Sequence, residues 1–151
     1  MIFEGLRVLE LGSLASASWC ARLFADFGAD VLKLEPDGGD PLRRAAPLFE
    51  NAGAKESAAF AFLNFGKRLA RECEADLPAL LADCDVLVRG DCDAPASLPA
   101  AESLIVIDAS WFGAGGPYRN QVAPAATVRG LAGLVPRVGT SHGAPLQDPE
   151  Y

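Results

Sequence analysis

Short aliphatic runs alternate along the chain with stretches whose apolar residues recur at helical spacing. Residues 6–11 (LRVLEL) form an aliphatic run that ends at Gly12 and Ser13, which predicts a strand followed by a turn. The next stretch, residues 16–27, has apolar or small side chains at the spacing of an amphipathic helix, and Gly28 is placed to end it. The opening of the chain therefore predicts a strand, a turn and a helix.

The same alternation continues further along the chain. Residues 29–35 (ADVLKLE) are a second strand-like run, which Pro36 ends. Residues 76–84 (DLPALLADC) place leucines on one helical face and lead into the aliphatic residues 86–88. Residues 104–107 (LIVI) are continuously aliphatic, which is typical of a strand covered by helices on both faces.

Strands and helices that alternate in this way are typical of α/β proteins. We therefore predict an α/β fold, a Rossmann-like parallel sheet with helices on both faces. Its adjacent parallel strands are expected at 6–11, 31–34, 86–88 and 104–107. Residues 37–55 have the composition of a loop, and one or two helical turns are predicted between residues 125 and 134.

The composition limits the classes of function. Of the 151 residues, 50% are apolar and 22% charged, which fits one folded domain over residues 1–151. The net charge is −7 and no basic run exceeds a pair, which argues against a nucleic-acid partner. The apolar runs are too short to span a bilayer, and the first residues do not resemble a signal peptide. We expect a cytoplasmic protein without a membrane partner.

The cysteines and the single histidine do not suggest a metal site. The four cysteines contain no C-x-x-C pair, and His142 lies far from them in the sequence. We expect reduced thiols, some of them packed as small apolar residues, and no bound metal.

The first strand, turn and helix can also be considered as a nucleotide site. Gly12 and Ser13 lead into a helix N-terminus, which suits a phosphate, and Glu35 can accept a ribose hydroxyl. The G-x-G-x-x-G pattern of dinucleotide sites is absent. The simpler interpretation is that Ser16 or Ser18 caps the helix and Glu35 is a solvated strand end.

Four blocks of sequence carry a family resemblance, and they occur in the expected order. They are GLRVLE with ARLFADFGADVLKLEP and GDPLR (residues 5–43), FLNFGKR (62–68), LADCDVLV (81–88) and FGAGGPY (112–118). Together they closely resemble the N-terminal portion of family III CoA-transferases, the CaiB/BaiF superfamily. This superfamily includes formyl-CoA transferase, carnitine-CoA transferase and the α-methylacyl-CoA racemases.

The resemblance implies a Rossmann-like N-terminal domain, acyl-CoA substrates and an interlocked homodimer. It covers only the N-terminal part of the family fold, so residues 1–151 are expected to be that domain and the C-terminal part to be absent. Coenzyme A is implied as part of the thioester substrate. The partner is expected to be a second copy or the remainder of a longer CoA-transferase chain, with the apolar groups at 111–112 and 131–135 at the contact.

The catalytic positions of the family are not matched here. In the transferases a catalytic Asp follows a glycine-rich region that residues 130–143 resemble, and it would fall at or beyond Tyr151. Asp148 is the only late carboxylate of suitable type, and its Gln-Asp-Pro-Glu context differs from the family pattern. In the racemases a His followed by Asp stands where this chain has Pro124 and Ala125. We therefore assign no catalytic residue and leave open whether the chain is an enzyme.

Three basic residues within the matched blocks are the expected CoA contacts: Arg43, Lys67 and Arg68. A guanidinium or ammonium group at these positions can meet a phosphate. The alternative is that Arg43 pairs locally with Asp40 and that Lys67 and Arg68 form a solvated loop end. Several other CoA-contacting positions of formyl-CoA transferase are replaced, for example by Ala15.

These observations leave two hypotheses. In the first, the chain is a degenerate, non-catalytic N-terminal domain of a family III CoA-transferase. In the second, it is a small independent nucleotide-binding or protein-interaction module that has kept a Rossmann-like core.

Overall fold

The computed structural model describes residues 1–51, 53–90, 103–113 and 115–133. The chain divides into two compact units, Met1–Ser110 and Trp111–Tyr151. The first unit contains the sheet, and the second contains α4 (Ala125–Leu131), which confirms the helical turns predicted there.

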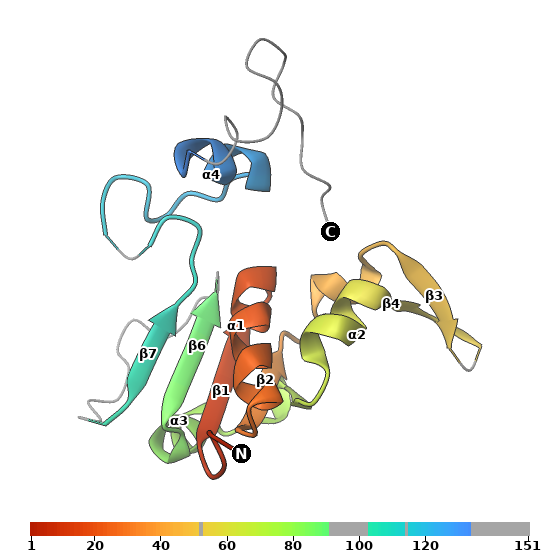
Figure 1. The fold of residues 1–151 in the computed structure, drawn as a ribbon, viewed down its shortest axis with the longest axis vertical. Helices are drawn as coiled ribbons and strands as arrows, with labels where there is room; N and C mark the ends of the chain where they lie inside the picture. Colours follow the sequence, from red (N-terminus) through yellow and green to blue (C-terminus); the bar gives the residue numbers. More distant parts are fainter. Residues whose placement is uncertain (52, 91–102, 114, 134–151) are drawn as a thin grey trace. The chain divides into compact units, whose positions relative to one another are not determined.

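A parallel sheet organises the first unit (Figure 1). Its strands are β1 (Arg7–Gly12), β2 (Asp30–Glu35), β5 (Arg68–Arg71), β6 (Val86–Gly90) and β7 (Ile105–Asp108). They lie in the order β5-β2-β1-β6-β7, and every neighbouring pair is parallel. The four predicted strands and their adjacency are confirmed. Strand β5 was not predicted, because its sequence RLAR has no aliphatic run.

The order of the strands reverses at β1. The chain passes from β1 to β2 and β5 on one side, then crosses back and adds β6 and β7 on the other side of β1. In parallel sheets of this kind, ligands bind beyond the carboxyl ends of the strands beside such a reversal. The topology therefore makes the carboxyl ends of β1 and β6, with the loops that follow them, the candidate ligand site.

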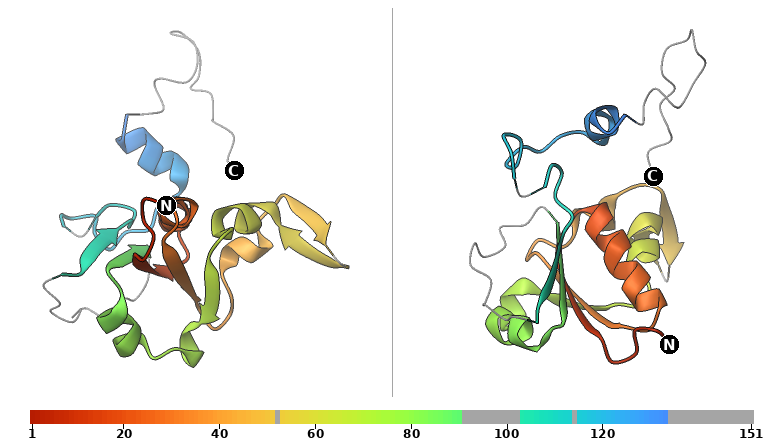
Figure 2. Two further views of the ribbon diagram at one scale, coloured as in Figure 1. Left: turned by 60° about the horizontal axis from the view of Figure 1, so that its bottom comes forward. Right: turned by 60° about the vertical axis from the view of Figure 1, so that its left-hand side comes forward.

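Helices lie on opposite faces of the sheet: α1 (Ala15–Asp26) on one and α3 (Leu77–Asp83) on the other (Figure 2). On the α1 face, buried alanines of the helix pack against strand valines: Ala17, Ala21, Val8, Val31, Val86 and Val88. On the α3 face the buried side chains are leucines: Leu9, Leu11, Leu34, Leu81 and Leu87. The predicted α/β sheet with helices on both faces is confirmed.

The two ends of α1 differ from one another in how they are stabilised. Gly28 follows the helix with a φ of 97°, and its N–H donates to the Ala25 carbonyl at 2.9 Å, as expected of a glycine that ends a helix. The N-cap is Leu14, which provides no side-chain hydrogen bond. The interpretation of Ser16 or Ser18 as the cap is therefore wrong, and Ser18 instead lies buried within the helix.

The prediction of a loop over residues 37–55 is partly wrong. This stretch contains the short 3-10 helix η1 (Pro41–Arg44), followed by β3 (Leu48–Asn51) and β4 (Ala54–Ser57), an antiparallel hairpin separate from the main sheet. The strand β3 is exposed throughout. A hairpin that buries so little has no clear alternation of apolar and polar residues, so its sequence resembles a loop.

Two further elements, a helix and a 3-10 helix, complete the described part of the first unit. Helix α2 (Ala58–Asn64) follows the hairpin, and the 3-10 helix η2 (Glu72–Glu74) precedes α3. Within the described ranges, no helix has the length and apolar character needed to cross a bilayer.

Candidate functional site

Four charged side chains lie buried on the α1 face of the sheet. Glu10 and Lys33 are 0% exposed and Asp40 is 1% exposed, and the side chain of Lys67 is also inaccessible to solvent. Two are acidic and two are basic, so their charges balance. Charged groups are rarely buried unless they are paired, and we refer to these four residues with Ser18 as the buried ion network.

Lys33 is at the centre of the network. Glu10 and Lys33 face each other across the β1–β2 register, and Lys33 Nζ lies 2.7 Å from Glu10 Oε1. The same ammonium group donates to Ser18 Oγ at 3.0 Å and to the Gly12 carbonyl at 3.2 Å. Lys33 therefore connects β2 to the carboxyl end of β1 and to the first turns of α1.

Asp40 brings the loop after β2 into the network. Its Oδ2 lies 2.9 Å from Lys33 Nζ as an ion pair, and its Oδ1 accepts a hydrogen bond from the Leu42 N–H at 2.8 Å. This second contact caps η1. One carboxylate thus fixes the start of η1 and balances a buried ammonium group.

Lys67 connects the turn after α2 to the same place. Its Nζ donates to Glu10 Oε2 at 2.6 Å, to the Ser18 carbonyl at 2.8 Å and to Asn64 Oδ1 at 3.1 Å. An ammonium group has three donors, and all three are used here. Burial lowers the pKa of Lys67, and the nearby Glu10 carboxylate partly opposes this effect.

Arg43 forms a second ion pair beside the network. Its Nε and Nη2 bind the two oxygens of Glu35 at 2.7 Å and 2.6 Å, and its guanidinium lies 4.0 Å from the centre of the Phe60 ring. The hydrogen bonds from Arg43 are the main reason that the pKa of Glu35 lies below its usual value. Glu35 also accepts a hydrogen bond from the Asp40 N–H at 3.2 Å.

These contacts correct three of the simpler interpretations. Glu35 is only 6% exposed, so it is not a solvated strand end, and both of its oxygens face Arg43. Arg43 takes Glu35 as its partner rather than forming the expected local pair with Asp40. Lys67 is buried rather than solvated.

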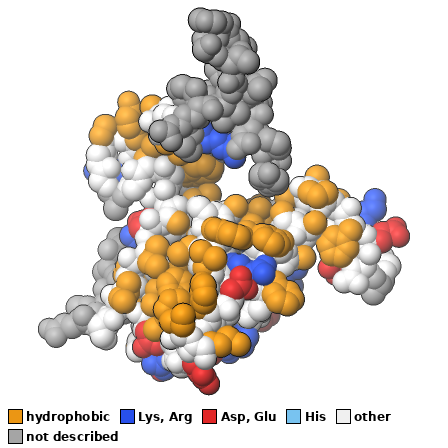
Figure 3. Space-filling model, in the orientation of Figure 1, with side chains coloured by type: hydrophobic (Ala, Val, Ile, Leu, Met, Phe, Trp, Pro, Cys, Tyr) orange, Lys and Arg blue, Asp and Glu red, His pale blue; other side chains and the backbone are white. Residues whose placement is uncertain are grey.

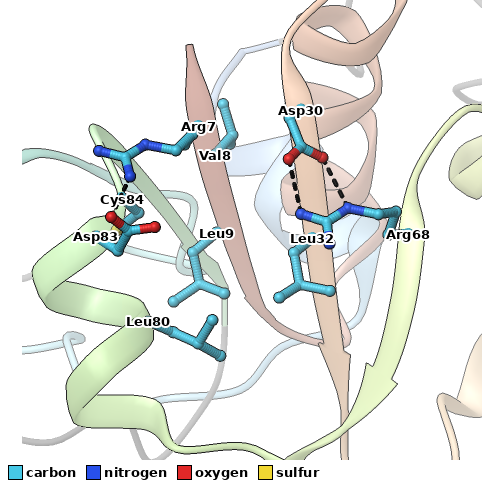
Figure 4. Close-up of a pocket in the computed structure, with 9 residues that line it drawn as sticks. All are labelled: Arg7, Val8, Leu9, Asp30, Leu32, Arg68, Leu80, Asp83 and Cys84. Carbon is cyan, nitrogen blue, oxygen red and sulfur yellow. Dashed lines mark hydrogen bonds and ion pairs between the residues drawn. The ribbon is translucent and has the colours of Figure 1, made fainter. Parts of the chain in front are cut away.

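Arg68 lies at the other end of the sheet. It forms two hydrogen bonds with the Asp30 carboxylate, at 2.8 Å and 2.7 Å, beside the start of β2 (Figure 4). Asp30 begins β2 and Glu35 ends it, so Arg43 and Arg68 occupy opposite ends of one strand. The structure therefore places Arg43 at the carboxyl end of β2 and Arg68 at its amino end, while the Lys67 ammonium group lies in the buried ion network. A role for each of the three in CoA binding stays a prediction.

Two cavities lie on the α3 face, away from the buried ion network. The smaller, of about 90 Å³, has Leu9, Leu32 and Leu80 at its base and is flanked by the pairs Arg68–Asp30 and Arg7–Asp83 (Figure 4). The larger, of about 510 Å³, shares Leu32, Leu80 and Asp83 with it and extends toward η2. The charged groups of the smaller cavity are paired, and Arg7 and Asp30 among them begin β1 and β2.

The described cysteines are free thiols: Cys20, Cys73 and Cys84. Burial raises the pKa of the Cys20 and Cys84 thiols, which keeps them protonated at neutral pH. Across the part of the chain that the structure describes, no group of three or more His, Cys, Asp or Glu residues is arranged to hold a metal ion.

An exposed aromatic patch covers the outer side of α1 and α2 (Figure 3). Its large side chains are Trp19, Leu23, Phe27, Phe62 and Phe65, which are between 42% and 68% exposed. Trp19 stacks on Phe62 with ring centres 5.6 Å apart, and the Arg22 guanidinium lies 4.8 Å from the Phe62 ring centre. Contiguous apolar patches on a protein surface can mark sites of interaction with a partner.

The sequence contained a signal for the buried ion network that the prediction did not use. Glu10 and Lys33 each stand inside an aliphatic run, LRVLEL and DVLKLE, that was expected to be covered on both faces. A charged residue at such a position needs a buried partner of opposite sign. The positions of Ser18 and Asp40 gave no such signal, because their contacts with Lys33 depend on how α1 and the loop after β2 fold against β2.

Comparison with known proteins identifies relatives of the whole chain. A sequence profile of CoA-transferase family III matches residues 3–149. The chain is 28% identical over 163 residues to the succinate–glutarate CoA-transferase of Agrobacterium fabrum, covering 95% of this chain and 41% of that protein. It is 29% identical over 149 residues to the succinyl-CoA–L-malate CoA-transferase alpha subunit of Chloroflexus aurantiacus, covering 87% of this chain and 34% of that protein.

A solved structure shows the same similarity. The CaiB/BaiF family protein from Brucella suis superposes with a TM-score of 0.79 at 25% identity, covering 96% of this chain and 43% of that one. The chain thus spans less than half the length of each of these relatives. The profile match extends over nearly all of the sequence and confirms the resemblance of the four blocks, so the chain belongs to CoA-transferase family III.

Proposed function

We propose that this chain provides the CoA-binding α/β domain of a family III CoA-transferase and does not transfer CoA by itself. The observation that carries the proposal is the carboxyl edge of the sheet. There the strand order reverses at β1, and the buried ion network holds the loops after β1 and β2 in place. This is the position at which parallel sheets bind nucleotide-like ligands.

Two features at this edge suit the phosphates of CoA. The 12-residue helix α1 begins here without a side-chain cap and without an acidic residue in its first turn, so its N–H groups and dipole favour an anion. Arg43 uses Nε and Nη2 to bind Glu35, and its side chain is 47% exposed. Its Nη1 has no hydrogen-bond acceptor among the described residues and can bind a phosphate.

The relatives named above act, by their names, on succinyl-CoA, succinate, glutarate or malate. We expect the substrate here to be an acyl-CoA thioester as well, with the CoA part bound by this domain. The absence of catalysis rests on the unmatched family positions: Pro124 and Ala125 replace the racemase pair, and Asp148, outside the described residues, lacks the transferase context.

The test is the affinity of the chain for CoA, measured by isothermal titration calorimetry. Arg43→Met should weaken binding about tenfold or more, since hydrogen bonds to charged groups contribute about 1.5–3 kcal/mol. Arg22→Met is the matched control, because Arg22 also pairs with a carboxylate, that of Asp26, and stacks on the Phe62 ring. It should leave the affinity unchanged.

Two results would contradict the proposal. One is the lack of measurable CoA binding at millimolar concentration. The other is equal affinity for CoA and for AMP, which would favour the second hypothesis of a small nucleotide-binding module. Equal loss of affinity in both arginine variants would separately remove the role given to Arg43.

A further inference from the structure

The buried ion network joins three separate segments on the α1 face of the sheet. Lys33 binds the Gly12 carbonyl, which precedes the loop from β1 to α1. Asp40 belongs to the loop after β2, and Lys67 belongs to the turn after α2. Each segment is attached through a lysine ammonium group, and both ammonium groups meet on the Glu10 carboxylate.

We propose that Lys67 is a positioning residue that sets the shape of the CoA-binding edge through Glu10 and Ser18, and that it does not itself touch CoA. The inference rests on the proposed function and deepens it. It differs from the expectation from sequence, in which Lys67 was a direct phosphate contact.

The geometry of Lys67 supports positioning over direct contact. Its side chain is fully buried, and its three donors point to Glu10, Ser18 and Asn64. A phosphate that bound Lys67 would have to enter this closed site and displace Glu10, the Ser18 carbonyl or Asn64, which leaves a buried acceptor without its donor and is costly. Arg43, in contrast, is half exposed at the same edge.

The contacts of Lys67 reach the loop that the proposed function uses. Its hydrogen bond to the Ser18 carbonyl holds α1 one turn after the helix begins, and its ion pair with Glu10 holds β1 two residues before the strand ends at Gly12. Glu10 Oε1 in turn accepts from Ser18 Oγ at 2.7 Å. Loss of the Lys67 ammonium group leaves Glu10 with one cation instead of two, and the anchoring of residues 12–18 is weakened.

The charge balance of the network supplies a decisive test. Lys67→Met leaves one excess negative charge among buried side chains, whereas the double variant Glu10→Gln with Lys67→Met leaves Lys33 paired with Asp40 and restores neutrality. We expect Lys67→Met to lower CoA affinity about tenfold or more, and the added Glu10→Gln to restore most of it. Glu10 is buried and cannot contact CoA, so restoration cannot come from a new ligand contact.

Lys67→Arg provides an independent comparison. A guanidinium group binds phosphate at least as well as an ammonium group, but its planar fork does not match a site built for three acceptors around one nitrogen. We expect Lys67→Arg to weaken CoA binding, and to accelerate hydrogen exchange in residues 12–18 and 36–43. Full affinity in Lys67→Arg, or no recovery in the double variant, would overturn the proposal.

The same hydrogen-exchange measurement separates this inference from the proposed function. If the wild-type chain binds no CoA, the proposed function fails, while faster exchange of residues 12–18 in Lys67→Met and its reversal in the double variant still show that Lys67 positions this edge. If Lys67→Met unfolds and the double variant folds, the excess negative charge on Glu10 is the cause of the defect, as proposed. If both variants unfold, Lys67 supports the whole sheet rather than this edge, and the proposal is wrong.

Discussion

Lys33 Nζ lies 2.7 Å from Glu10 Oε1 between two paired strands, and neither side chain is reached by solvent. The pair occupies positions where the neighbouring residues on the same face, Val8 and Val31, form part of an apolar cluster. A buried salt bridge is weak evidence of stability by itself, but the removal of one partner leaves an uncompensated charge. The α1 face of the sheet is therefore apolar at the amino end and ionic at the carboxyl end.

Lys33→Met should strongly destabilise the fold. It leaves Glu10 and Asp40 facing a single remaining lysine, and the loss of one partner of a buried pair costs about 3–5 kcal/mol. Arg68→Met is the control, because it breaks the exposed pair with Asp30 and should cost about 1 kcal/mol or less. Urea unfolding followed by circular dichroism measures both. Equal stability of the two variants would contradict this account of the buried ion network.

Gly90→Ala tests the packing of α1 against the end of β6. A Cβ at this position would lie 2.9 Å from the Ala17 Cβ and 3.0 Å from the Leu14 Cβ, so the start of α1 would have to move away. We expect a loss of about 1–3 kcal/mol in the free energy of unfolding, as for other overpacked sites. Gly38→Ala meets no atom within 4 Å and should change stability by about 0.5 kcal/mol or less. A neutral Gly90→Ala would show that this contact is loose.

The acid sensitivity of the fold should depend on Glu35. Arg43 lowers the pKa of Glu35 in the folded state, so the unfolded chain binds more protons and stability rises with pH across this window. The contribution is fully present above the unfolded value of about 4.3 and is lost as the pH falls through the lower folded pKa.

Glu35→Gln should therefore be less stable than the wild type at neutral pH, and the difference should shrink as the pH falls below about 4.3. Thermal unfolding between neutral pH and about pH 3 measures this effect. Glu4→Gln is the control, because its carboxylate is 83% exposed and pairs only with the N-terminus among the described contacts. A constant difference between Glu35→Gln and the wild type at all pH values would contradict the assignment.

The chain alone should not transfer CoA. We expect no exchange between succinyl-CoA and a free dicarboxylate acceptor, and no epimerisation of a 2-methylacyl-CoA, because the family's catalytic positions are unmatched. Liquid chromatography of the acyl-CoA pool measures both reactions. Turnover that disappears in Asp148→Ala would show that the late carboxylate is the nucleophile and that the chain is an enzyme.

The aromatic patch should make the chain associate with a second copy or with the remainder of a longer protein. We expect self-association in sedimentation at micromolar concentration and binding of a hydrophobic dye, both reduced by Phe65→Ser. Leu131→Ser tests the contact predicted from sequence, and the two side chains are similarly exposed, at 68% and 69%. Residues 134 and 135 of that predicted contact lie outside the described ranges. A dye-free monomer would contradict the expectation of a partner.

Sequence reasoning located the sheet well because the runs around Val8, Val31 and Val88 are aliphatic and are buried between layers. It missed β5 because the strand RLAR packs little and pairs only along one side with β2. It also missed the hairpin of β3 and β4, whose residues are mostly exposed. The periodicity of apolar residues reflects which side chains are buried, so an element that buries few side chains has only a weak periodicity.

The site was less accessible to prediction than the fold. Arg43 and Lys67 were singled out as basic residues for a phosphate, but their partners were not, because Glu35 and Glu10 lie 8 and 57 residues away in the sequence. Hydrogen bonds between separate segments form only in the folded protein, and local sequence patterns do not reveal which residues will meet. The two charges inside aliphatic runs were the signal available in advance.

The outer strands β5 and β7 give the sheet two borders of different character. On β5, Arg68 and Arg71 are the first and last residues of the strand. Charged side chains on an edge strand disfavour pairing with another strand. On β7, Ile105 and Val106 are 61% and 39% exposed, and no strand of the described chain lies beyond them. The β7 edge therefore favours the addition of a further strand more than the β5 edge does.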